Sequence, residues 1–147
     1  MLKSICLAAA MVAVAAAPAA AAGECGAAPI APAIPAVSDL AGKTVEAGRA
    51  EVVSAYHQVK AYQASLQPFR GCLQQQAKVD QDALTAAQAE GDKGKDKVAS
   101  LQQSMKDMQS VYDHTVDTET QVATDFNNLH VAQCKVDTDQ NICPKKQ

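Results

Sequence analysis

Apolar side chains recur at helical spacing through the middle of the chain. From Val45 to Leu73 every seventh residue is Val or Leu, and two aromatic residues, Tyr62 and Phe69, lie three positions off that row. Most of the positions between them carry Lys, Gln, Glu, Arg or Ala. A seven-residue spacing of this kind is typical of a helix that packs one apolar seam against a partner. The pattern predicts a long amphipathic helix that continues to about residue 90 and needs a covering element.

The start and the middle of this helix carry further signals. Residues 38–39 (Ser-Asp) are suited to cap a helix, whereas Gly42 and Gly48 weaken the first turns, so we expect a firm helix from about Thr44. Pro68 has no N–H to donate and crowds the preceding turn, which predicts a kink or a short break. Because the seam stays in register beyond the proline, we expect one bent helix rather than two helices.

A second seam follows a charged segment. Residues 90–97 contain two glycines, alternating charges and no apolar side chain, which predicts a turn. A second helix is expected from about residue 96 to residue 134, with polar Thr115 and Glu119 at two seam positions. The apolar positions of this seam are Val98, Leu101, Met105, Met108, Tyr112, Val122, Phe126 and Leu129.

Folding the chain at the charged turn places the two seams opposite each other. Phe126 then faces Val59, and Glu119 lies near Lys60 and Gln63. The predicted fold is therefore all-α, a long antiparallel helical hairpin of the coiled-coil kind. Two helices bury only one stripe each, so either the N-terminal segment or a second copy of the chain must cover the rest.

The N-terminus has the pattern of a secretory signal peptide. Residues 1–22 combine a positive start, an Ala-rich apolar run and an Ala-x-Ala site, with cleavage expected near Ala22/Gly23. The run is shorter than the ~20 apolar residues of a membrane span. We therefore expect a periplasmic or secreted product that has no integral membrane anchor after cleavage.

The segments that flank the hairpin differ in composition. Residues 23–37 contain Pro29, Pro32 and Pro35, a spacing that predicts an extended, polyproline-like strip; a flexible linker is the alternative. Residues 135–147 are polar and are expected to form a solvated C-terminal tail.

Length and charge exclude some functions. The 147 residues suffice for one small domain, and three Tyr, two Phe and no Trp leave only a thin core. The formal charge is −3, and it becomes −4 when Lys3 leaves with the signal peptide. An acidic surface argues against nucleic acid as a partner, because counterion release needs basic residues.

Four of the five cysteines lie outside the signal peptide, and an even number in an exported chain favours two disulfides. In the hairpin, Cys134 lies roughly 30 Å from Cys72 along the helix axis, which disfavours a bond between them. The proline strip, when extended, is just long enough to bring Cys25 back to Cys72. This geometry favours Cys25–Cys72 together with Cys134–Cys143, and it leaves the other pairings open.

One set of motifs resembles a group of small exported alphaproteobacterial proteins. It consists of Cys25 with the proline strip, then residues 59–62 (Val-Lys-Ala-Tyr), then residues 69–73 (Phe-Arg-Gly-Cys-Leu). Residues 116–127 are similar to the second helix of that group. The resemblance implies a helical hairpin and a Cys25–Cys72 bond. It implies no activity.

Three residues could together hold a metal. His130 and Cys134 are four positions apart and share a helix face, and His57 lies nearly level with His130 across the hairpin. Against this hypothesis, an exported thiol usually ends in a disulfide. We predict no resident metal or cofactor, and we retain these residues only as candidate zinc or copper ligands.

Other patterns have simpler interpretations. Tyr56 and Lys60 have the Tyr-x-x-x-Lys spacing of some dehydrogenases, but no Gly-rich phosphate loop accompanies them, so a core tyrosine is expected. Residues 137–141 begin like a calcium loop, but Ile142 stands where that loop needs Gly. Residues 84–88 (Leu-Thr-Ala-Ala-Gln) match the Leu-Thr-x-x-Gln motif of cradle-shaped periplasmic stress chaperones.

The sequence therefore predicts a non-enzymatic binding or structural module of the periplasm that contacts a protein partner or a second copy of itself. A chaperone-like protein that presents a helical surface to unfolded clients is the alternative. A metal-binding protein is the third hypothesis.

Overall fold

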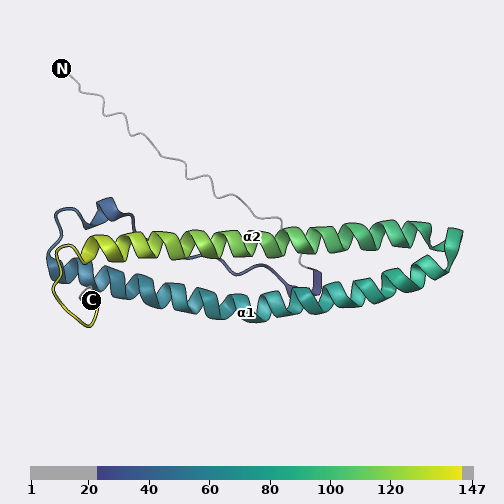
Figure 1. The fold of residues 1–147 in the computed structure, drawn as a ribbon, viewed down its shortest axis with the longest axis horizontal. Coiled ribbons are helices and arrows are strands. Elements are labelled where there is room, and N and C mark those ends of the chain that lie inside the picture. Colours follow the sequence, from purple (N-terminus) through teal and green to yellow (C-terminus); the bar gives the residue numbers. More distant parts are fainter. Residues whose placement is uncertain (1–22, 144–147) are drawn as a thin grey trace, which may run out of the picture.

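The computed structural model describes residues 23–143 as two long antiparallel helices (Figure 1). The first, α1, spans Val45–Ala89 and the second, α2, spans Lys95–Gln133. The predicted all-α hairpin is confirmed. The expected signal peptide, residues 1–22, lies outside the described residues. Three short 3-10 segments complete the fold: η1 (Gly23–Cys25), η2 (Val37–Leu40) and η3 (Gly91–Gly94).

The first helix begins where the sequence predicted a firm helix. The Thr44 hydroxyl accepts a hydrogen bond from the Ala47 N–H at 3.2 Å and so caps α1. The expected cap at residues 38–39 is wrong as a start of this helix. Asp39 instead accepts the Ala36 N–H within η2, and Gly42, with φ +78°, turns the chain before α1 begins.

Pro68 does not interrupt α1. The helix runs unbroken through this residue, so the predicted short break is wrong and the prediction of a single helix is confirmed. The proline is exposed on the outer side, whereas its neighbours Leu66 and Phe69 are buried in the interface with α2. Packing on both sides of Pro68 compensates for the lost hydrogen bond. Figure 1 shows α1 bowed along its length.

The core consists of three consecutive clusters along the helix interface. Near the middle of the hairpin, Phe69 and Leu73 of α1 pack on Met108, with Tyr112 beside them. Two further clusters continue toward the open end, where the helix termini meet. Their buried members are Val59, Tyr62, Leu66 and Val122 in the second cluster, and Val52, Ala55 and Leu129 in the third. Phe126 packs on both of these clusters, as its predicted position opposite Val59 requires.

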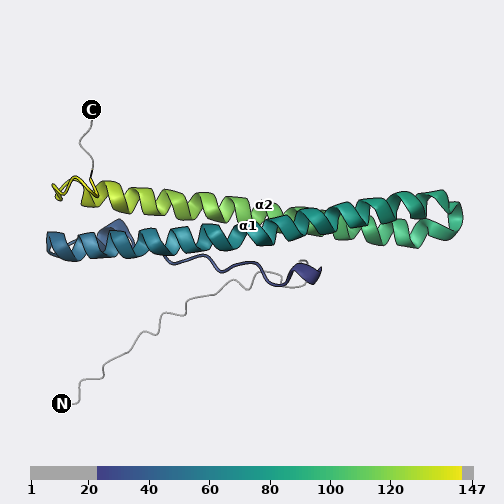
Figure 2. The ribbon, with the colours of Figure 1, turned by 90° about the horizontal axis from the view of Figure 1, so that it is seen from below.

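The N-terminal strip supplies the third layer over this part of the hairpin. Ala28 packs on the first cluster, Ala31 on the second, and Ile34 on the second and third. Figure 2 shows the strip running alongside the helices. The disulfide between Cys25 and Cys72 fastens its far end to α1. The strip therefore covers the core of this half of the hairpin. Of the two covering elements considered, the N-terminal segment or a second copy of the chain, the N-terminal segment takes this place here.

The turn between the helices is tighter than predicted. It occupies η3, Gly91–Gly94, rather than residues 90–97, and α2 begins at Lys95. Gly91 has φ +63°, a conformation that favours glycine. A Cβ on Gly94 would lie 2.0 Å from the Ala87 carbonyl oxygen, so the chain can pass here only without a side chain.

Two regions follow from this arrangement. The covered half comprises residues 45–73 of α1 and 108–133 of α2 beneath the strip. The distal arm comprises residues 74–107, which extend to the turn. Within the described residues, no helix combines the length and the apolar character needed to cross a membrane.

Candidate functional site

A polar layer interrupts the core near its middle. Arg70 forms an ion pair with Glu119 at 2.6 Å, and its Nε donates to the Thr115 hydroxyl at 2.8 Å. Gln63 donates to the other Glu119 oxygen at 3.1 Å, which confirms the predicted neighbourhood of these two residues. The cationic partner of Glu119 is Arg70.

Other groups complete this layer. The Arg70 guanidinium also lies over the ring of Tyr112, 5.7 Å from its centroid. Burial raises the pKa of the neighbouring Tyr62 phenol, and Arg70 opposes that shift. The polar seam positions that the sequence marked at Thr115 and Glu119 are thus satisfied by side chains of α1, and the layer fixes the register of the two helices.

The C-terminal segment is anchored at the open end of the hairpin. Arg49 donates two hydrogen bonds to the Asp137 carboxylate, at 2.8 and 2.7 Å, and pairs with Asp139 at 3.1 Å. The side chain of Asp137 is fully buried, so the predicted solvated tail is wrong at this position. The bonds from Arg49 hold the pKa of Asp137 well below its usual range, and Asp137 raises the pKa of Arg49.

A glutamine completes this anchor. Gln133 is buried, and its Nε2 donates to the Val45 carbonyl at 2.9 Å. A Cβ on Gly48 would lie 2.2 Å from the Gln133 Oε1. A side chain at position 48 would therefore displace the Gln133 amide, a role for Gly48 beyond the weak helical turn that the sequence indicated. We call the group Arg49, Gln133, Asp137 and Asp139 the tail anchor.

A cleft of about 470 Å³ opens beside the tail anchor, between the two helices and the returning tail. Aromatic and imidazole rings line much of it. Phe126 stacks on His130 with ring centroids 5.9 Å apart and lies 6.0 Å from the Tyr56 ring. Tyr56 is 47% exposed, so its predicted place in the core is wrong. The full lining is Val52, Val53, Tyr56, His57, Phe126, His130, Asn141 and Ile142.

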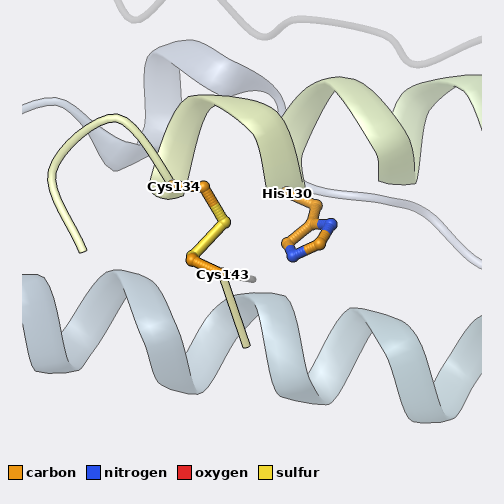
Figure 3. A group of neighbouring side chains, drawn as sticks. All are labelled: His130, Cys134 and Cys143. Atoms are coloured by element: carbon orange, nitrogen blue, oxygen red, sulfur yellow. A yellow bond between two sulfur atoms is a disulfide. The ribbon is translucent and has the colours of Figure 1, made fainter. Parts of the chain in front are cut away.

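Of the three candidate metal ligands, only His130 and Cys134 have their ligand atoms close together. His57 and His130 line the same cleft, as their predicted level positions require. Among the described residues, however, the ligand atoms within 4.8 Å of one another belong to His130, Cys134 and Cys143, and His57 is not among them. Cys134 and Cys143 form the second disulfide, so both bonds are those that the sequence favoured. Figure 3 shows the His130 ring beside this disulfide.

Comparison with known proteins adds no functional assignment. No family model, no curated protein and no solved structure matches this chain.

Proposed function

We propose that this chain is an exported, non-enzymatic binding or structural module of the periplasm that presents its distal arm to a protein partner or to a second copy of itself. One observation carries the proposal: the three core clusters and the strip all lie on the covered half. In the distal arm, by contrast, the buried apolar residues are Leu84 and Ala87.

The distal arm leaves several apolar side chains accessible to solvent. Val79 is 55% exposed on α1. Three apolar side chains of the arm that do not pack on a core cluster are only half-buried: Ala83, Val98 and Leu101. A helix pair with an open apolar edge gains free energy when a third or fourth helix covers it. Because acidic and basic residues are mixed at the tip, apolar contact rather than net charge is expected to select the partner.

Export is supported by the cysteines. All four cysteines of the described residues are paired in disulfides, and such bonds persist in oxidising compartments. Two part-buried ion pairs, Arg70 with Glu119 and Arg49 with Asp137, hold structural elements together. These roles favour a binding or structural function over an enzymatic one.

The test combines light scattering with capture of proteins from a periplasmic extract by the mature chain. We expect either a dimer or a reproducible bound protein, and we expect Leu101→Glu and Val79→Glu to abolish it. Val131→Glu is the matched control, because Val131 is 50% exposed on α2 of the covered half. A monomer that captures nothing, or equal effects of all three substitutions, would refute the docking role of the distal arm.

The chaperone-like alternative predicts a different result. Leu84 and Ala87 of the Leu-Thr-x-x-Gln motif are buried in the helix interface, so packing accounts for their spacing. A holdase would suppress aggregation of many unfolding clients and would show no preferred partner. Suppression that persists in Leu101→Glu would favour this alternative over the docking proposal.

A further inference from the structure

The returning tail brings a third potential metal ligand to the two on α2. His130 lies in the last turn of α2 and Cys134 is its C-terminal cap, and Cys143 reaches them from the tail, so that the ligand atoms all lie within 4.8 Å of one another. Figure 3 shows this group at the open end of the hairpin. In the oxidised chain the two sulfurs are bonded to each other. Metals bind the thiolate form of cysteine, so the disulfide masks the site.

We propose that reduction of the Cys134–Cys143 bond creates a binding site for a thiophilic d¹⁰ cation, Cu(I) or Zn²⁺, with His130, Cys134 and Cys143 as its ligands. Two thiolates and one imidazole suit either cation, Cu(I) as a three-coordinate ion and Zn²⁺ with a water in the fourth position. This inference is independent of the proposed docking function.

The redox step balances with a dithiol reductant. Its two thiols become a disulfide, and the two electrons and two protons convert Cys134–Cys143 into two thiols. Binding of the cation then releases the two thiol protons to solvent. Metal binding therefore opposes reoxidation of the bond.

The present geometry needs only small changes to accept a cation. With Zn–S near 2.3 Å, two thiolates of a tetrahedral site lie ~3.8 Å apart, and each sulfur lies ~3.5 Å from the imidazole nitrogen. Both separations lie within the 4.8 Å that now bounds the whole group. Cys143 follows Cys134 by only nine positions, in a loop outside both helices, so its sulfur can move while α2 stays in place.

The histidine is already held beside the sulfurs. The Ile142 carbonyl lies 2.6 Å from its Nε2, and Phe126 stacks on the ring at an interplanar angle of 13°. The stacking contact restricts the ring plane, so the ring loses little freedom when a cation binds. Because the carbonyl accepts from Nε2, a cation binds through Nδ1 or replaces this hydrogen bond at Nε2. His57 lines the same cleft but lies outside the ligand group, which makes it a matched control.

The test uses the full mature chain, reduced with a phosphine and desalted without oxygen. It is titrated with Co²⁺ as a spectroscopic probe for Zn²⁺, and with Cu(I) in competition with a chromophoric chelator. We expect one cation per reduced chain, a thiolate-to-cobalt charge-transfer band, and no such binding by the oxidised chain. Displacement of Co²⁺ by Zn²⁺ then gives the Zn²⁺ affinity, and comparison of that affinity with the Cu(I) affinity identifies the preferred cation.

Variants assign the ligands. Cys134→Ser with Cys143→Ser should abolish the band, whereas Cys25→Ser with Cys72→Ser should retain it. His130→Ala should weaken binding by about tenfold or more, and His57→Ala should leave the affinity unchanged. Equal binding by the oxidised chain, by the Cys134/Cys143 variant or by His130→Ala would overturn the proposal. So would a reduced chain that loses its helical circular dichroism and binds no cation.

Discussion

The covered half and the distal arm are built from the same two helices, but different elements stabilise them. In the covered half, seven apolar or aromatic α1 residues from Val52 to Leu73 are buried, the strip forms a third layer, and two disulfides and the tail anchor close the structure. The distal arm relies on the Leu84 and Ala87 contacts, the tight turn, and a hydrogen bond between Ser104 and Asp80 at 2.8 Å. The difference shows that the strip, the disulfides and the tail anchor stabilise one half of the hairpin, whereas the other half depends on contacts between its two helices alone.

The largest expected effect comes from releasing the strip. Cys25→Ser with Cys72→Ser opens a loop with a sequence separation of 47, and loop-closure entropy predicts a loss of about 4 kcal/mol. Cys134→Ser with Cys143→Ser opens a separation of only 9, for which about 3 kcal/mol is expected. Urea unfolding followed by circular dichroism measures both losses. A larger loss for the second pair would show that the strip does not stabilise the covered half.

Two leucine truncations compare the regions directly. Leu66 is 1% exposed in the second cluster, whereas Leu84 is 8% exposed in the distal arm. Leu66→Ala should cost about 3–4 kcal/mol and Leu84→Ala about 2 kcal/mol, because fewer side chains surround the cavity in the arm. Urea unfolding measures the free energy of unfolding of each variant. Equal losses of stability would contradict the proposed difference in packing.

The polar layer should behave as a unit. Arg70→Met removes the ion pair and the bond to Thr115 and leaves Glu119 half-buried without its cation, for an expected loss of ~2 kcal/mol. The double substitution Arg70→Met with Glu119→Leu should recover part of that loss. A double-mutant cycle measures the coupling, and strictly additive losses would mean that the two side chains do not cooperate.

The smallest effect concerns pH and the tail anchor. The native pKa of Asp137 is lowered by its bonds from Arg49, so this carboxylate contributes stability above its unfolded pKa of about 3.9. That contribution is lost as the pH falls below about 4 toward the native pKa. Between pH 5 and pH 2 the urea midpoint of the wild type should therefore fall more than that of Asp137→Asn. Parallel curves for the two proteins would contradict this assignment.

The hairpin and its register could be predicted because both depend on short-range periodicity. The apolar rows on α1 and α2 define the faces that must meet, and the turn glycines define where the chain reverses. The register of the seam predicted a single helix through Pro68, but it could not show that the helix continues without a break, because that depends on contacts of Leu66 and Phe69 with another helix. Tertiary packing here overrides a local signal.

Most side-chain contacts of the polar layer and the tail anchor were not predicted, because they too depend on tertiary packing. Arg70 was counted as one of the polar residues beside the seam, although its long side chain reaches Thr115 and Glu119 across the interface. Asp137 was assigned to a solvated tail, because the position of that tail depends on the Cys134–Cys143 loop. The pairing of Phe126 with Val59 places Arg70 opposite Thr115, and a basic residue opposite a polar seam position is the signal that could have identified Arg70.

Amide hydrogen exchange of the intact, oxidised chain tests the central comparison most directly, since it reports the opening free energy of each helical segment. We predict the slowest exchange for amides within residues 52–73 and 112–129. Within the helical part of the distal arm, residues 77–89 and 98–105, exchange should be faster. Equal protection along both helices, or slower exchange in the distal arm than beneath the strip, would contradict the account.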